Sequence, residues 1–183
     1  ISLVLFSPHC NLKGPTCHNK SLRNPPLAFC RTVKDVIEKD ITPMTGAVVF
    51  LGGEPTVWGS SLVRAVEYVK KYNLKTKLFT NGMKPEVVKE LLNRNLLNSI
   101  SVDFKATTNI SDVLGVDELS DDDYMDTVGK TLDLVSEYLK THKDFKAEIR
   151  TTAFDTIDLD DVKDIVSNLW GQIPHIIQKP NKI

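Results

Sequence analysis

Two cysteines and two histidines lie close together near the start of the chain and form its most reactive cluster. Six residues separate Cys10 from Cys17, with His9 before the first thiol and His18 after the second. Thiolates bind soft metals, so this pattern favours an iron–sulfur cluster, zinc or copper(I). Two partly buried cysteines near a turn, with no metal, are the simpler alternative.

Other short segments with polar side chains lie on later apolar runs or directly after them. They are Gly52-Gly53-Glu54-Pro55, Thr80-Asn81-Gly82, Asp103-Phe104-Lys105, Glu148-Ile149-Arg150 and Ile177-Gln178. Glycines let a ligand approach the backbone closely, and Glu54 offers an acceptor for an ammonium group. Taken singly, Gly-Gly-Glu-Pro and Asn81-Gly82 are also ordinary turn sequences, and Asp103 with Lys105 is also an ordinary surface ion pair.

Short β-branched runs alternate with longer segments of helical period, which predicts repeated βα units. The expected strands are residues 2–6, 47–51, 75–80, 99–104, 145–152 and 175–178. The expected helices are residues 31–39, 61–72, 85–94, 121–142 and 158–170, and residues 107–123 are expected to form a long loop. Strands joined by helices run parallel, so the polar segments should meet at one edge of the sheet.

The number of units suggests an incomplete barrel. A closed eight-unit barrel typically needs ~250 residues, and this chain has 183. We therefore expect an α/β fold whose parallel sheet curls into an open, partial (β/α)6 barrel, built as one domain over residues 1–183. A flat doubly wound sheet is the alternative. Because Ile1 opens a strand, we also expect a short natural segment before it.

Together these segments resemble the radical S-adenosylmethionine (SAM) superfamily, in particular the activating enzymes of glycyl radical enzymes. Their loop reads Cys-x3-Cys-x2-Cys followed by His-Asn, and Cys10, Cys17, His18 and Asn19 match it. The later segments are similar to the family's Gly-Gly-Glu-Pro, Thr-Asn-Gly and Asp-x-Lys motifs, in the same order. The resemblance covers essentially the whole chain and implies a radical SAM type of partial barrel.

The resemblance also implies two cofactors, a 4Fe-4S cluster and SAM. Cys10 and Cys17 would be cluster ligands and catalytic residues. In an intact member, three thiolates hold the cluster and leave one iron open to the amino and carboxylate groups of SAM. The residues that the resemblance assigns to SAM, or to a monovalent cation beside it, are Gly52, Gly53, Glu54, Thr80, Asn81, Asp103, Lys105, Arg150 and Gln178.

The chain departs from the family pattern at the middle cysteine, which falls on Gly14. Glycine has no side chain and cannot ligate iron. Cys30, His9 and His18 are the nearby substitutes, although Cys30 fits the role of a small buried apolar residue better. We therefore expect a compromised cluster site.

The activity implied by the resemblance is reductive cleavage of SAM to generate a glycyl radical on a large partner, for example an anaerobic ribonucleotide reductase. A reduced flavodoxin or ferredoxin type of electron donor would supply the electron. The alternatives are a radical SAM enzyme acting on a small molecule, a non-catalytic SAM-binding relative, and a zinc protein that uses Cys10, Cys17 and the two histidines.

Composition limits the remaining classes of partner. The chain carries 23 Lys plus Arg against 24 Asp plus Glu, a formal net charge of -1. This balance gives no electrostatic basis for binding nucleic acid or an acidic membrane surface. Its three cysteines are too few for a disulfide framework and suggest a cytoplasmic location.

Overall fold

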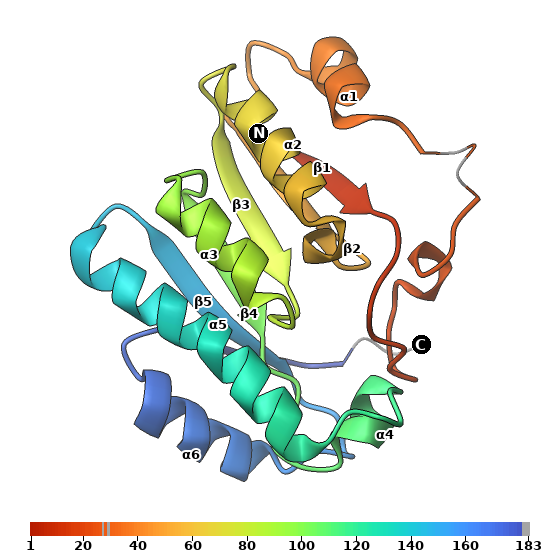
Figure 1. Cartoon of the computed structure of the whole chain (residues 1–183), viewed down its shortest axis with the longest axis vertical. Helices are drawn as coiled ribbons and strands as arrows, with labels where there is room; N and C mark the ends of the chain where they lie inside the picture. The colour runs from red at the N-terminus through yellow and green to blue at the C-terminus, as the bar shows by residue number, and fades with distance from the viewer. Residues whose placement is uncertain (27, 29, 181–183) are drawn as a thin grey trace.

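The computed structural model describes residues 1–26, 28 and 30–180. Its centre is one parallel sheet in which the strands pair in chain order, β1 to β6 (Figure 1). The strands are β1 (Ser2–Ser7), β2 (Ala47–Gly52), β3 (Lys75–Thr80), β4 (Ser99–Asp103), β5 (Lys146–Thr152) and β6 (His175–Gln178). β1 and β6 lie at opposite ends of the sheet and do not pair with each other, so the barrel is open. The predicted α/β fold with a parallel, partly closed sheet is confirmed.

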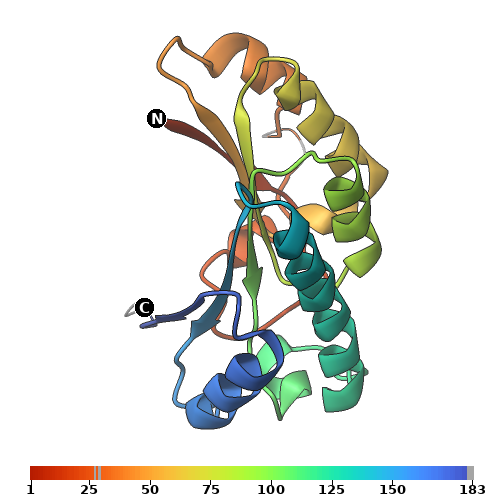
Figure 2. The same ribbon diagram turned by 90° about the vertical axis from the view of Figure 1, so that its left-hand side faces the viewer.

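The long helices cover one side of the curved sheet (Figure 2). They are α1 (Val33–Asp40), α2 (Ser60–Lys70), α3 (Pro85–Asn93), α5 (Asp121–Thr141) and α6 (Leu159–Trp170). Short 3-10 turns lie at η1 (Lys20–Leu22) and η3 (Pro55–Trp58). Strands and helices fall within a few residues of their predicted limits, because clear turn and capping signals bound most of them.

The core lies between the sheet and the helices, and alternate residues of the strands contribute apolar side chains to it. Val48, Phe50, Leu78, Ile100 and Ile149 each have an exposed fraction of 2% or less and pack beneath the helices. Successive strand side chains point to opposite faces, so the residues between them lie on the concave face. This arrangement explains why apolar residues on β1 can remain accessible.

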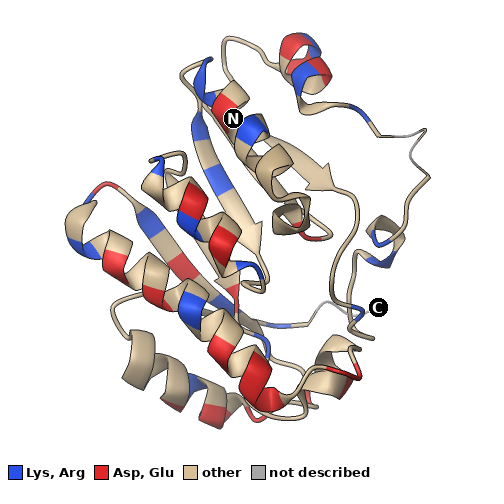
Figure 3. Cartoon of the chain, in the orientation of Figure 1, with Lys and Arg blue, Asp and Glu red and all other residues tan. Residues whose placement is uncertain are grey.

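Helix α5 has a capped N-terminus whose first turn is acidic. The Ser120 hydroxyl accepts a hydrogen bond from the Asp123 backbone N–H at 3.1 Å and caps the helix. Asp121, Asp122 and Asp123 then lie at the positive end of the helix dipole, seen as the red first turn of α5 in Figure 3. The cap and the acidic residues therefore stabilise the start of this long helix.

The structure corrects the prediction that residues 107–123 form a long loop. They contain a short helix, α4 (Ile110–Leu114), which follows Asn109 in the left-handed region and ends at Gly115 with φ 63°. Ile110 and Leu114 are buried, so this turn is held by burial of two side chains. An apolar pair four residues apart is too short a pattern to predict a helix from sequence.

No helix in the described part of the chain combines the length and apolar character needed to cross a bilayer.

Truncating a central core side chain tests the packing. Leu78 on β3 is fully buried, so Leu78→Ala should lower the free energy of unfolding by about 2–5 kcal/mol. Leu169→Ala on α6 is the control, because Leu169 is 59% exposed and its loss should cost under about 0.5 kcal/mol. Urea denaturation measures both. Equal costs for the two variants would contradict this core assignment.

Candidate functional site

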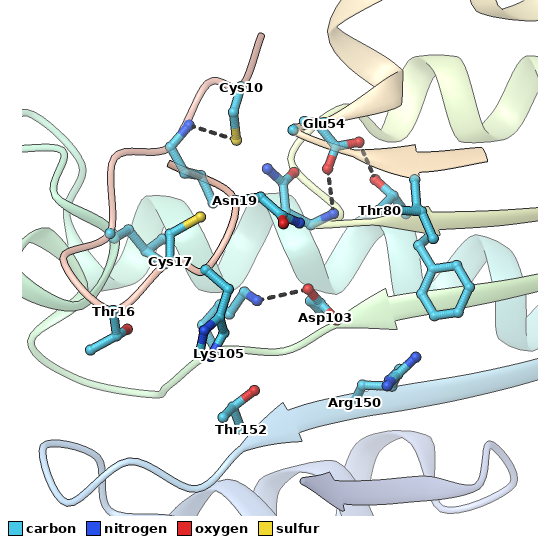
Figure 4. A pocket seen from close by; sticks show the side chains of 18 of the residues that line it. Cys10, Thr16, Cys17, Asn19, Glu54, Thr80, Asp103, Lys105, Arg150 and Thr152 are labelled. Carbon is cyan, nitrogen blue, oxygen red and sulfur yellow. Dashed lines mark hydrogen bonds and ion pairs between the residues drawn. The ribbon is translucent and has the colours of Figure 1, made fainter. Parts of the chain in front are cut away.

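A cavity of about 420 Å³ lies at the carboxyl edge of the sheet. Its volume falls within the range of small-molecule sites, and this edge is where enzymes of related βα architecture bind substrates. The loop after β1 closes one side, and the ends of later strands form the other (Figure 4). Every site residue predicted from the sequence lines it: Cys10, Cys17, Gly52, Gly53, Glu54, Thr80, Asn81, Asp103, Lys105, Arg150 and Gln178.

The loop after β1 packs backbone to backbone against the Gly-Gly turn after β2. Gly53 N–H donates to the Ser7 carbonyl at 2.8 Å, and Glu54 N–H donates to the His9 carbonyl at 2.8 Å. A Cβ at Gly53 would overlap the His9 carbonyl, so only glycine permits this approach. The glycines therefore bring the thiol-bearing loop onto the sheet edge.

Glu54 is a buried anchor between two strand ends. Its Oε1 accepts hydrogen bonds from Thr56 N–H at 3.0 Å, Thr56 Oγ1 at 2.6 Å and Thr80 Oγ1 at 2.7 Å. Its Oε2 accepts one from Asn81 N–H at 2.7 Å. Burial raises the pKa of Glu54, although these donors oppose the shift. Oε2, with a single donor, retains acceptor capacity, and Glu54 lines the cavity.

An amide pair connects the loop to β3. The Asn81 Nδ2 donates to Asn11 Oδ1 at 2.8 Å, and Asn81 Oδ1 accepts from Met83 N–H at 3.1 Å. Asn19 Nδ2 also donates to the Gly52 carbonyl at 3.3 Å. Side-chain hydrogen bonds thus hold both ends of the loop against the sheet.

Charged side chains from β4 and β5 complete the strand side of the cavity. Lys105 Nζ donates to Asp103 Oδ2 at 2.7 Å, so this ion pair lies in the cavity wall. Arg150 Nε donates to Gln178 Oε1 at 3.2 Å, and its guanidinium lies 4.9 Å from the centre of the Phe79 ring. These contacts hold Arg150 and Gln178, on neighbouring strands, in one arrangement.

The two thiols line the cavity from the loop side (Figure 4). Cys10 Sγ accepts from Leu12 N–H at 3.4 Å, and burial raises the pKa of the Cys10 thiol. Cys30 is exposed, which corrects the expectation of a buried apolar role. Within the described ranges, no cluster of three or more His, Cys, Asp or Glu side chains is arranged to hold a metal ion.

Gly14 contacts the end of α4 where the family pattern has its middle cysteine. Lys13 N–H donates to the Leu114 carbonyl at 2.7 Å, and a Cβ built on Gly14 would lie 2.7 Å from the Val113 carbonyl oxygen. Any side chain here would require the loop or α4 to shift. Two thiols and this packed glycine do not fit a 4Fe-4S cluster held by three thiolates.

Several further lining residues were not predicted from the sequence. Arg23, Phe79, Thr152 and Phe154 also line the cavity. Strand alternation could have placed Phe79, because Lys77 and Phe79 share the face opposite the buried Leu78. Arg23 lies in an irregular segment after η1, where no periodic pattern predicts which way a side chain points.

A family model described as the Radical SAM superfamily matches residues 4–169. The chain belongs to this superfamily.

The chain is also similar to a curated protein and to several solved structures. A Methanocaldococcus jannaschii protein, named "Putative glycyl-radical enzyme activating enzyme", is 33% identical over 106 residues, covering 57% of this chain and 43% of that protein. Among solved structures, Streptococcus suis SuiB bound to precursor peptide SuiA matches with a TM-score of 0.70 and 16% identity, over 98% of this chain and 39% of that chain. The structure of native anSMEcpe with bound AdoMet matches with a TM-score of 0.62 and 18% identity, over 98% of this chain and 51% of that chain. At these identities the solved structures support the fold, and this chain spans about half or less of each protein.

Adding a side chain at position 14 tests the contact with α4. Gly14→Ala and Gly14→Cys should each lower the free energy of unfolding by about 1–3 kcal/mol, because both add a Cβ against the Val113 carbonyl. Gly46→Ala is the matched control, since the nearest atom to its Cβ would be 4.0 Å away. Urea denaturation of the three variants gives the comparison. A Gly14→Ala variant as stable as Gly46→Ala would refute the contact.

Removing one donor from the Glu54 carboxylate tests the buried anchor. Thr80→Val should lower the free energy of unfolding by about 1–3 kcal/mol, because it leaves a buried carboxylate oxygen with one fewer donor and the Gly82 N–H without its acceptor; only the first loss depends on pH. The folded-state pKa of Glu54 already lies above its unfolded value, so stability falls as pH rises between the two. The Thr80→Val variant should raise the folded-state pKa of Glu54 further. Its loss of unfolding free energy should therefore be larger at pH 8 than at pH 5.

Thr131→Val is the control for this pH effect. The buried Thr131 hydroxyl donates to the neutral Gly82 carbonyl at 2.6 Å, so its loss should cost the same at both pH values. Denaturant titrations at pH 5 and pH 8 compare the two variants. A Thr80→Val cost that does not change with pH would show that Glu54 does not titrate in this range.

Proposed function

We propose that the cavity binds SAM and that the chain is the core of a radical SAM protein of the glycyl-radical activating type. The observation that carries this proposal is the convergence of the predicted residues, from five strand ends and one loop, on a single cavity. Each motif alone has an ordinary structural explanation. Their meeting at the carboxyl edge is what a shared ligand requires.

The chemistry of the cavity walls suits the parts of SAM. Backbone carbonyls of the Gly52-Gly53 turn and the remaining acceptor capacity of Glu54 would take the ammonium group. Asp103 would accept from ribose hydroxyls, and its ion pair with Lys105 fixes its direction. Gln178 and Arg150, held together across β5 and β6, would contact the adenine end. These residues orient the ligand and exclude water from it.

The activating role extends the proposal from the ligand to a partner. Similarity to the named M. jannaschii protein supports a glycyl radical enzyme as the partner, with an anaerobic ribonucleotide reductase as one example. A reduced flavodoxin or ferredoxin would be the donor. In this chain the cluster site is compromised at Gly14, so we assign the residues above to binding SAM and assign no redox step to the two thiols.

A non-catalytic SAM-binding relative is the second candidate, favoured by the packing of Gly14. If the loop was shaped around the contact with Val113, glycine is its native residue and no third thiolate belongs there. This candidate predicts that SAM binding does not depend on iron.

Calorimetric titration of SAM, with and without anaerobic iron–sulfur reconstitution, tests the proposal. We expect saturable binding by the unmodified chain in both states, fewer than four irons per chain and no SAM-sensitive EPR signal after reduction. Absence of SAM binding in both states would refute the proposed function. A SAM-sensitive cluster signal from the unmodified chain would refute the compromised site.

A Gly14→Cys variant separates the two candidates, with Gly46→Cys as the control for an added thiol elsewhere. A SAM-sensitive signal in Gly14→Cys alone would support a compromised activating enzyme, because the third thiolate restores the site. No signal in either variant, with SAM binding intact, would support the non-catalytic relative.

A further inference from the structure

The cavity has three lysine or arginine side chains in its walls, and two of them have acidic partners. Lys105 pairs with Asp103 at 2.7 Å. Arg150 lies 3.8 Å from Glu148, measured from Nη1 to Oε1, and bonds Gln178. The third cation is Arg23. In the part of the chain that the structure describes, the side-chain hydrogen bond of Arg23 goes to the Gly14 carbonyl rather than to a carboxylate.

The Arg23 guanidinium also holds a donor without a partner. Its Nε is buried, and no acceptor contacts it among residues 1–26, 28 and 30–180. A buried, unpaired donor on a charged group destabilises the protein, because no hydrogen bond replaces the one that the donor made to water. Because the buried Nε cannot reach a ligand itself, the part of the Arg23 guanidinium that lines the cavity would have to supply the N–H groups that bind a carboxylate.

Backbone contacts connect the residue before Arg23 to the Gly-Gly turn, and the guanidinium itself contacts the Gly14 carbonyl. Leu22, the residue before it, accepts a hydrogen bond from His9 N–H at 2.8 Å through its carbonyl. His9 in turn accepts from Glu54 N–H at 2.8 Å. Arg23 is thus connected through His9 to the turn proposed for the ammonium group, whereas Gln178 lies on the last strand.

We propose that Arg23 binds the carboxylate of the methionine end of SAM in this chain. The inference rests on the proposed function and names the group that its methionine end would meet. In a three-thiolate member, an open iron takes that carboxylate. Here Gly14 leaves the third ligand position without a thiolate, and its carbonyl oxygen instead orients the Arg23 guanidinium. Arg23 then supplies the positive group that the carboxylate requires.

Decarboxylated SAM provides the sharpest probe, because it keeps the ammonium, sulfonium and adenosine and lacks only the carboxylate. In chelator-treated protein, we expect calorimetry to give a Kd for SAM at least about ten-fold lower than for decarboxylated SAM. Arg23→Gln should remove most of this preference, and Arg23→Lys should keep part of it. Arg64→Gln, on the outer helix α2, is the matched control and should keep all of it.

A third probe separates binding from folding. 5′-Methylthioadenosine lacks the amino-acid part of SAM, so its affinity should be the same in Arg23→Gln and in the unmodified chain. If Arg23→Gln weakens both ligands equally, Arg23 has only a structural role and the proposal is wrong.

Three other calorimetric results would contradict the role of Arg23. Equal affinity of the unmodified chain for SAM and decarboxylated SAM would overturn the assignment of the carboxylate to Arg23. A preference for SAM that persists in Arg23→Gln would assign the carboxylate to Lys105 or Arg150 instead. If the unmodified chain binds neither SAM nor methylthioadenosine, the proposed function itself fails, and this inference with it.

Discussion

The buried carboxylate of Glu54 is the interaction on which the geometry of the site depends. A carboxylate that is 2% exposed is stable only when donors replace its water, and this one has four. The donors come from the turn after β2 and from the end of β3. Satisfying the carboxylate therefore fixes these two chain segments relative to each other and sets one corner of the cavity.

The thiol loop is positioned by its backbone more than by its side chains. It meets the Gly53 turn on one side and the end of α4 on the other, through hydrogen bonds of 2.7–2.8 Å. At both contacts a glycine is present where a Cβ would meet a carbonyl oxygen. The same close packing that holds Cys10 and Cys17 at the cavity leaves no room at position 14 for a third thiol without movement.

Charge pairing distinguishes the three cations in the cavity walls. Cations that already have acidic partners contribute fixed hydrogen-bond directions, whereas an unpaired guanidinium attracts an anionic group from the ligand. In the proposed binding mode, the ammonium group of SAM would meet acceptors at the Gly52-Gly53 turn, and its carboxylate would meet a donor at Arg23. Under the proposed function, the cavity would stay complementary to SAM although the metal-binding pattern is incomplete.

The sequence alone determined the order of strands and helices, the parallel sheet and the residues at the strand ends. These follow from local pattern: the alternation of apolar and polar residues sets which strand residues are buried, and the polar motifs lie in the last residues of the strands or directly after them. The sequence did not reveal α4, whose five residues are held by burial of Ile110 and Leu114. Nor did it reveal that Cys30 is exposed or that Arg23 lines the cavity. Only the tertiary structure decided these points, because they depend on how segments distant in the sequence pack together. The contact of Lys13 and Gly14 with residues 113–115 is one example, which no local pattern records.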